Sequence, residues 1–211
     1  MNIFHLQYHY GKYSMYNLGI LMISCLIFFT ACSDNDYTPK PRIYPKVEFP
    51  AKAYKAFDAT YCDFTFEQPT YIKIIQDKTF FDTLPKHPCW FNIDYPTLGG
   101  TLHCTYSAID QKNTVNKLIN DSYRMAEEHT KRAEYIDERA VHNPTDNVYG
   151  LLIDIGGPAA SPFQFFLTDS TNHFFRGSLY FNTRPNPDSL KPIVNFVKED
   201  IEKMVKTFKW N

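Results

Sequence analysis

Apolar residues alternate along residues 163–181, and this alternation predicts a long antiparallel hairpin. One face of the hairpin carries Phe163, Phe165, Leu167, His173, Phe175, Gly177, Leu179 and Phe181. Residues of one face must lie opposite one another, so the two strands require a loop with an odd number of residues. Ser170–Asn172 provides such a loop, and we expect Asn172 to take its left-handed position. The pattern therefore predicts two antiparallel strands with one clearly apolar face.

A second pair of alternating runs lies within residues 90–107, with a turn containing proline and glycine between them. Matching the apolar faces of these two strands places Ile93 opposite Cys104. On the other face, the same register places Asp94 opposite His103. The two hairpins together predict an antiparallel sheet.

The remaining periodicity predicts two helices and two more strands. In chain order these are a helix over 113–131, a polar strand over 134–142, a buried strand over 149–155 and a helix over about 189–208. Asn113 is expected to cap the first helix. Asp188 or Ser189 is expected to cap the second, with Pro192 in the first turn, where proline is tolerated.

This order of elements predicts an α+β fold, in which an antiparallel β-sheet and two main helices pack as a sandwich. The topology resembles that of PsbP/Mog1-like domains. The resemblance is an analogy of pattern, and it transfers no function.

The longest uncharged apolar run, residues 18–31, is too short to cross a bilayer as a helix and fits the core of a secretory signal peptide. Two small residues, the second of them Ala31, directly precede Cys32. This arrangement predicts a lipoprotein signal peptide over residues 1–31, with cleavage between Ala31 and Cys32 and with fatty acyl chains such as palmitate on Cys32. The interpretation left open is a buried first helix that contains a free cysteine.

Residues 32–45 are polar and rich in proline, which predicts a flexible tether. No linker interrupts residues 46–211, and their length suits one domain. We therefore expect a single α+β domain after the tether. The true start of the chain is open between Met1 and Met15.

Cys62, Cys89 and Cys104 follow the tether, and export would place them in an oxidising compartment. Three is an odd number, so no complete disulfide framework is implied. The register given above holds Cys104 opposite Ile93. For that reason Cys89 and Cys104 are not expected to pair with each other.

The chain has 22 basic and 23 acidic residues, and both signs are interspersed along nearly its whole length. Nucleic-acid-binding proteins concentrate basic charge to release counterions, so this distribution excludes a nucleic-acid partner. Hydrophobic residues make up 44% of the chain, which excludes a disordered protein. The histidines and cysteines lack the spacing of a metal site, and residues 156–158 (GGP) carry no phosphate-binding or esterase motif. Neither a metal nor a cofactor is expected.

Asp94 and His103 are the candidates for catalysis, because a carboxylate can orient an imidazole that acts as a base. No nucleophile is evident beside them, unless Thr105 or Ser107 serves. An exposed ion pair across the two strands is the favoured interpretation. We therefore predict no catalytic residues, and we keep a hydrolase that uses Asp94 and His103 as the rival hypothesis.

The second face of the long hairpin contains the candidate partner-binding residues, Phe166, Phe174, Arg176 and Tyr180. Aromatic residues mixed with arginine are typical of the centres of protein interfaces. In the predicted register Phe166 lies opposite Arg176, and Phe165 lies opposite Gly177 on the other face. The alternative is that the C-terminal helix covers this second face and makes it part of the core.

The chain resembles the GldD gliding-motility lipoproteins of Bacteroidetes from Cys32 to its C-terminus. The residues that carry the resemblance are 36–42 (DYTPKPR), 90–96 (WFNIDYP), 163–181 (FQFFLTDSTNHFFRGSLYF), 188–190 (DSL) and Trp210. The long string is specific, whereas the short strings are weak alone. The sequence departs from the family at Ile43, where glycine is usual before Tyr44.

The resemblance implies an outer-membrane lipoprotein that gliding over surfaces and the linked type IX secretion system require. It implies no enzyme and no cofactor, and only the lipid-bearing Cys32 has a defined role. The expected partners are other envelope proteins of gliding and type IX secretion, and the membrane itself through the lipid. We expect a non-catalytic interaction or assembly domain that faces the periplasm, with the cell surface left open. The rival is a periplasmic hydrolase or carbohydrate-active enzyme, and a small-ligand binding module would require a cavity.

Overall fold

The computed structural model describes residues 46–58, 60–76 and 87–211. The predicted signal peptide over 1–31, the lipidation site Cys32 and the tether over 32–45 lie outside these residues. Within the described part, no helix combines the length and the hydropathy needed to span a bilayer.

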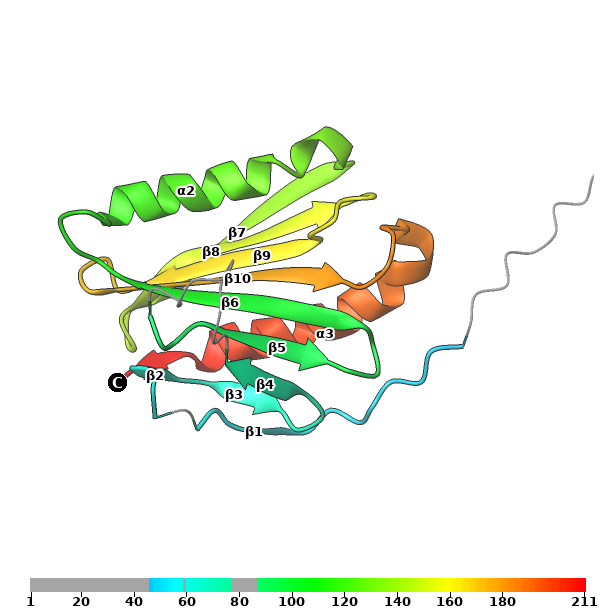
Figure 1. The fold of residues 1–211 in the computed structure, drawn as a ribbon, viewed down its shortest axis with the longest axis horizontal. Helices are drawn as coiled ribbons and strands as arrows, with labels where there is room; N and C mark the ends of the chain where they lie inside the picture. The colour runs from blue at the N-terminus through cyan, green and yellow to red at the C-terminus, as the bar shows by residue number, and fades with distance from the viewer. Residues whose placement is uncertain (1–45, 59, 77–86) are drawn as a thin grey trace, which may run out of the picture. The chain divides into compact units, whose positions relative to one another are not determined.

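A seven-stranded antiparallel sheet forms the body of the fold (Figure 1). In spatial order its strands are β4 (Lys73–Gln76), β5 (Phe91–Tyr95), β6 (Gly100–Ala108), β10 (His173–Phe181), β9 (Phe163–Thr168), β8 (Val148–Gly156) and β7 (Tyr135–Asn143). Two small ribbons accompany the sheet and pair β1 (Tyr54–Ala56) with β3 (Glu67–Pro69), and β2 (Phe64–Thr65) with β11 (Lys209–Trp210).

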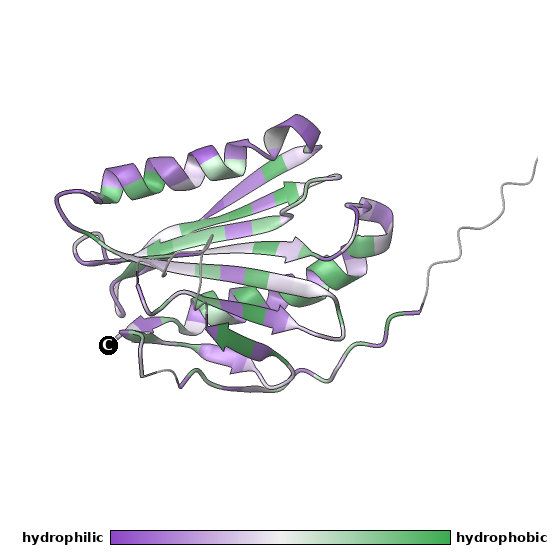
Figure 2. Cartoon of the chain, in the orientation of Figure 1, coloured by the Kyte–Doolittle hydropathy of each residue, from purple (hydrophilic) through white to green (hydrophobic). Residues whose placement is uncertain are grey.

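Two helices lie on opposite faces of this sheet. Helix α2 (Val115–Glu127), followed by the short 3-10 helix η1 (Thr130–Arg132), packs against β9 and β10 on what we call the α2 face. Helix α3 (Pro187–Thr207) lies behind the sheet in Figure 1, on the α3 face, together with the small ribbons. In Figure 2, α2 is mostly hydrophilic, with interspersed apolar residues. The predicted α+β fold, an antiparallel sheet with two main helices, is confirmed.

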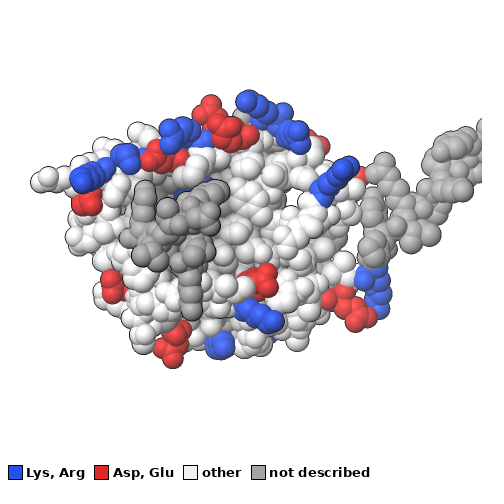
Figure 3. Space-filling view, in the orientation of Figure 1, with Lys and Arg blue, Asp and Glu red and all other residues white. Residues whose placement is uncertain are grey.

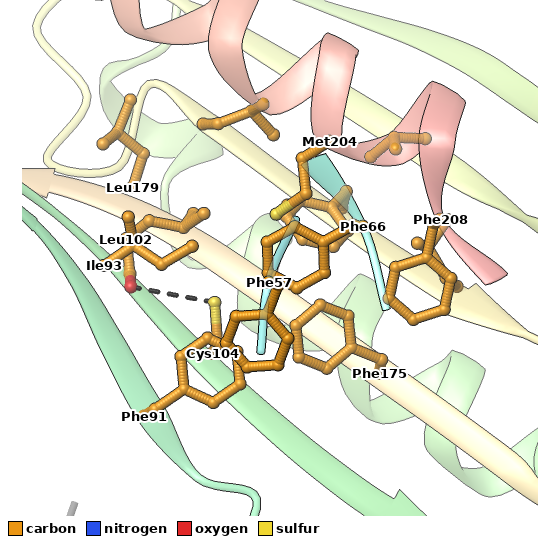
Figure 4. Packing of buried hydrophobic residues seen from close by; sticks show 14 of the residues in the cluster. Phe57, Phe66, Phe91, Ile93, Leu102, Cys104, Phe175, Leu179, Met204 and Phe208 are labelled. Atoms are coloured by element: carbon orange, nitrogen blue, oxygen red, sulfur yellow. Dashed lines mark hydrogen bonds between the residues drawn. The ribbon is translucent and has the colours of Figure 1, made fainter. Parts of the chain in front are cut away.

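The main core lies between the sheet and α3 and consists largely of phenylalanine rings (Figure 4). The ring centroid of Phe64 lies 4.7 Å from that of Phe175 and 4.9 Å from that of Phe208. Phe57 stacks on Phe66 with a centroid separation of 4.4 Å. The apolar stripe expected on the C-terminal helix points into this core, and its residues are Ile193, Val197, Ile201, Met204 and Phe208. Burial of these large side chains removes much apolar surface from water and is the main stabilising contribution.

The long hairpin has the predicted register, with Phe165 opposite Gly177 and Phe166 opposite Arg176. A Cβ atom on Gly177 would lie only 2.2 Å from the Phe165 ring, so glycine is required there. The expectation that Asn172 takes the left-handed conformation is wrong, because Ser170 adopts that conformation, with a φ of 68°.

The Asp169 carboxylate determines this loop conformation. Its Oδ1 atom accepts hydrogen bonds from the backbone N–H groups of Thr171, Asn172 and His173. These bonds fix the residues that follow Ser170, none of which has a positive φ. Ser170 is therefore the loop residue that takes the left-handed conformation.

The register predicted for the first hairpin is wrong by two residues. Cys104 lies opposite Phe91 rather than Ile93, and Asp94 lies opposite Thr101 rather than His103. A tighter turn explains the difference, because the Leu98 and Gly99 N–H groups both donate to the Tyr95 carbonyl at 3.0 Å. Gly99 adopts the left-handed conformation that this turn requires, with a φ of 63°. A shift of two residues leaves every side chain on its predicted face.

The helix ends differ from the predicted ones. Thr114, not Asn113, caps α2 by accepting a hydrogen bond from the Lys117 backbone N–H at 3.3 Å. Asn113 instead donates its N–H to the Asp110 side chain at 2.6 Å.

The start of α3 also lies earlier than predicted. Asn186 occupies the cap position without a side-chain hydrogen bond, so neither Asp188 nor Ser189 caps the helix. Pro192 therefore lies inside α3, beyond its first turn.

A disulfide joins Cys62 to Cys89, and sequence reasoning missed it. The bond links the segment before β2 to the segment before β5, across a sequence separation of 27. Cys104 is a free, buried cysteine, in agreement with the expectation that it does not pair with Cys89. Because cytosolic proteins rarely retain such bonds, the pairing suits an exported domain.

Removing the disulfide with the double change Cys62→Ala and Cys89→Ala should lower the free energy of unfolding by on the order of 3–4 kcal/mol. The unfolded chain regains the entropy that a cross-link over 27 residues removes. Urea unfolding of the oxidised protein and of the variant measures the difference. A reducing agent should destabilise the natural chain equally and leave the variant unchanged. If the urea midpoint of the natural chain is the same with and without the reducing agent, the prediction is contradicted.

A buried carboxylate ties the start of the domain to α3. The side chain of Asp200 is fully buried and accepts hydrogen bonds from Lys52 Nζ at 2.6 Å, Tyr54 at 2.8 Å and Tyr71 at 2.7 Å. Lys52 Nζ also donates to the Phe196 carbonyl at 2.7 Å and lies 3.6 Å from the centre of the Phe196 ring. Burial, and then the hydrogen bond to Asp200, raise the pKa of both tyrosines, so their hydroxyl groups remain donors.

Candidate functional site

The aromatic residues predicted for partner binding lie beneath α2. Phe166 and Phe174 are only 6% and 3% exposed, and their rings stack with centroids 5.3 Å apart. The ring of Tyr123 of α2 and that of Phe166 lie edge to face, with centroids 6.5 Å apart. The alternative interpretation, in which the C-terminal helix covers this face, is wrong, because that helix lies on the opposite side of the sheet and α2 provides the cover. A partner that contacts the α2 face therefore meets the neighbouring residues Arg176 and Tyr180, which are half-buried.

Arg176 is a half-buried cation in the middle of the sheet. Its Nη2 atom donates to Gln164 Oε1 at 2.7 Å, and that acceptor is a neutral amide. No described carboxylate forms an ion pair with Arg176. Burial lowers the pKa of its guanidinium group, which remains charged at neutral pH. A partly desolvated charge without a counter-ion costs stability, so its presence calls for an explanation.

The groups around Arg176 are polar but uncharged or weakly basic. The Tyr180 hydroxyl lies 3.5 Å from His129 Nε2, and the His103 ring meets Tyr180 with centroids 5.6 Å apart. Burial, and then the positive charge of Arg176, lower the pKa of His129, so this imidazole is neutral at pH 7. The visible part of the face between α2 and β5 is largely uncharged, whereas both signs of charge lie along α2 (Figure 3). The surroundings of Arg176 therefore favour an anionic or acceptor group from outside.

The two catalytic candidates are not paired. Asp94 Oδ1 accepts a hydrogen bond from Thr101 at 3.2 Å, and His103 Nδ1 lies 2.7 Å from Asn92 Oδ1. Both contacts follow from the observed register of β5 and β6. The expected cross-strand pair is wrong, and the hydrolase hypothesis loses the acid–base pair on which it depended. In the described part of the chain, no three His, Cys, Asp or Glu side chains are placed to hold a metal ion.

A pocket of about 290 Å³ lies where the amino end of β7 and the carboxyl ends of β8 and β10 meet α3, a feature that the sequence could not show. Its apolar walls are Tyr135, Ile155, Pro162, Phe181, Leu190 and Val194. An ion pair between Lys198 of α3 and Asp154 of β8 also lines it. The break at Gly156 and Gly157, which looked like a plain loop in the sequence, forms part of its rim.

Comparison with known proteins gives one family and a remote structural likeness. The family model described as gliding motility lipoprotein GldD matches residues 34–210. No curated protein matches the sequence. Among solved structures, the chain is similar to the solution structure of cyanobacterial PsbP (CyanoP) from Synechocystis sp. PCC 6803. That match has 13% identity and a TM-score of 0.47, and it covers 77% of this chain and 95% of the other.

Proposed function

Because the chain belongs to the GldD family of gliding-motility lipoproteins, we propose that it is a lipid-anchored, non-catalytic accessory protein of gliding and of the linked type IX secretion system. It acts as an interaction or assembly domain at the outer membrane and faces the periplasm. Its partners are other envelope proteins of the same machinery, and the lipid on Cys32 holds it to the membrane.

The disulfide supports the location in this proposal. Cys62 and Cys89 are both buried, and the bond between them joins segments distant in sequence. Such a structural bond persists in the oxidising periplasm rather than in the cytosol. An exported body agrees with a lipid-anchored protein of the cell envelope.

Arg176 is the single observation that carries the interaction role. Arg176 lies in the middle of β10, and Gln164 is the one side chain among the described residues that accepts a hydrogen bond from its guanidinium group. A partner can therefore supply acceptors for the other N–H groups. Arginine is among the residues that contribute most to binding when an interface desolvates them. A binding role accounts for a charge that costs stability in the free domain.

Replacing Arg176 by methionine should separate stability from binding. The change Arg176→Met keeps the aliphatic stem and removes the unpaired charge, so the free energy of unfolding should stay the same or rise. Binding of the native partners should weaken by about 30-fold, the effect of losing a central arginine contact. Affinity purification from detergent-solubilised membranes, with quantitative mass spectrometry, measures the partners, and circular dichroism measures the fold.

Arg184→Met is the matched control, since Arg184 is an exposed arginine in the segment between β10 and α3. It should leave both the fold and the recovered proteins unchanged. Equal recovery from the two variants would contradict the proposed role of Arg176. Loss of the folded spectrum in Arg176→Met would instead assign this arginine to the core.

A further inference from the structure

Strand β7 is a long free edge of the sheet. It runs over nine residues, Tyr135–Asn143, and β8 is the only described strand that pairs with it. The opposite edge strand, β4, has four residues. Proteins usually shorten edge strands, bend them with a bulge or place proline in them. β7 contains no proline and keeps a continuous register with β8 along its whole length.

Both faces of β7 are open to solvent. Seven of its nine residues are exposed. Its first two residues are large apolar side chains, with Tyr135 55% exposed and Ile136 40% exposed. These two lie side by side in sequence and therefore point to opposite faces of the sheet. An added strand could thus bury apolar surface on both of its faces.

The exposed edge along β7 carries mostly negative charge. Glu134, Asp137 and Glu138 are exposed and take part in no described ion pair. The one cation of the strand, Arg139, is already paired with Glu202 of α3. A strand that pairs with β7 meets uncompensated carboxylates, which favours lysine or arginine at the facing positions.

The pocket of about 290 Å³ lies at the amino end of β7, where Glu134 and Tyr135 line it. The Tyr135 ring lies over Gly156, since a Cβ atom on that glycine would come within 1.9 Å of it. The apolar wall continues from this ring to Ile155, Phe181 and Leu190. Its volume is close to the lower limit for small-molecule sites, which suits a single side chain of a larger partner.

We infer that β7 and this pocket form a docking site for an extended, basic peptide segment of another protein, which adds a strand to β7 and places one apolar side chain in the pocket. Main-chain hydrogen bonds to the free edge give affinity, and the pocket and the carboxylates give specificity. The inference goes beyond the proposed function, because it requires no contact with Arg176.

Charge on an edge strand can also serve only to prevent aggregation. That explanation accounts for Asp137 and Glu138, but it requires neither a pocket at the end of the strand nor exposed apolar residues beside it. The two explanations differ in a measurable way. Under the protective one, β7 binds no peptide.

The test uses the full-length lipoprotein in detergent micelles and a phage library of random nine-residue peptides. Selected peptides should alternate lysine or arginine with other residues and carry one aromatic or aliphatic anchor. Hydrogen exchange of the complex with a selected peptide should show slowed amides in residues 135–143. Two variants should each weaken binding at least tenfold: Ala160→Trp, which fills the pocket from an exposed lining position, and Asp137→Lys with Glu138→Lys.

The matched control is Asp58→Lys with Glu128→Lys, which makes the same change in charge at two exposed positions outside β7. It should bind the selected peptides normally. The inference is overturned if the library yields no binder, if selected peptides are acidic, or if protection falls outside β7. Dimerisation through β7, seen by sedimentation, would also overturn it, because the occupant would be a second copy. Protection confined to β6 and β10 would overturn this site and leave the proposed role of Arg176 standing.

Discussion

Replacing Asp200 by alanine should destabilise the domain by about 3–5 kcal/mol, the cost of removing one partner from a buried charged network. The carboxylate is fully buried and is the common acceptor for Lys52, Tyr54 and Tyr71. Its loss leaves an ammonium group without its close partner and two hydroxyl groups without an acceptor. Urea unfolding, followed by tryptophan fluorescence and circular dichroism, measures the change in free energy.

The neighbouring residue provides the control. Glu199 lies 3.5 Å from Lys52, but its side chain is 70% exposed. Solvent screens this second contact, so Glu199→Ala should cost less than about 1 kcal/mol. An equal loss in the two variants would show that the burial of Asp200 is not what stabilises the domain.

Replacing Cys32 by serine should release the protein from the membrane and abolish both gliding and secretion through the type IX system. This prediction depends on the proposed lipid anchor. Each buried CH₂ group of an acyl chain contributes about 0.8 kcal/mol, so several chains on one residue hold the protein firmly at the membrane. Serine cannot form the thioether bond to the lipid. Intact mass spectrometry and detergent-phase partitioning measure the loss of the anchor, colony spreading measures gliding, and the amount of type IX cargo in the culture medium measures secretion.

Ser33→Ala changes a small side chain at the next position and serves as the control. It should leave the acylated mass, the membrane fraction and colony spreading as they are in the natural chain. An unacylated natural protein, or normal spreading by cells that carry Cys32→Ser, would remove the anchor from the proposed function.

The two hairpins show how far a sequence determines register. For the long hairpin, loop length and the pairing of bulky Phe165 with Gly177 both favour the observed register. For the first hairpin, shifting the strands by two residues leaves the same side chains on the same faces, so hydrophobic matching cannot choose between the registers. The turn at Tyr95 and Gly99 decides, through backbone hydrogen bonds that have no simple sequence signal.

The site was less predictable than the fold, because its contacts join distant segments. Phe166, Phe174, Arg176 and Tyr180 do share one face, as the alternation of β10 with β9 required. The sequence does not show which helix covers that face, because this depends on the path of the chain between strands and helices. In the structure α2 covers it, not α3. The pocket at Tyr135 forms where the ends of three strands meet the first half of α3, and no local pattern encodes that meeting.

The disulfide and the Asp200 network were missed for the same reason. Cys62 lies in an irregular segment without periodicity, so nothing in the sequence placed it near Cys89. Asp200 looks like an ordinary polar residue of an amphipathic helix. Its partners come from the first segments of the domain, more than a hundred residues away.

Lys52 has a mechanical consequence. It lies before β1, close to the amino end of the described chain, and it is held by both Asp200 and the Phe196 carbonyl of α3. Tension applied to the chain from its amino end reaches the contact between Lys52 and α3 before it reaches β1. The force at which the domain begins to unfold therefore depends on the contact between Lys52 and α3, and the seven-stranded sheet bears the load only after this contact breaks.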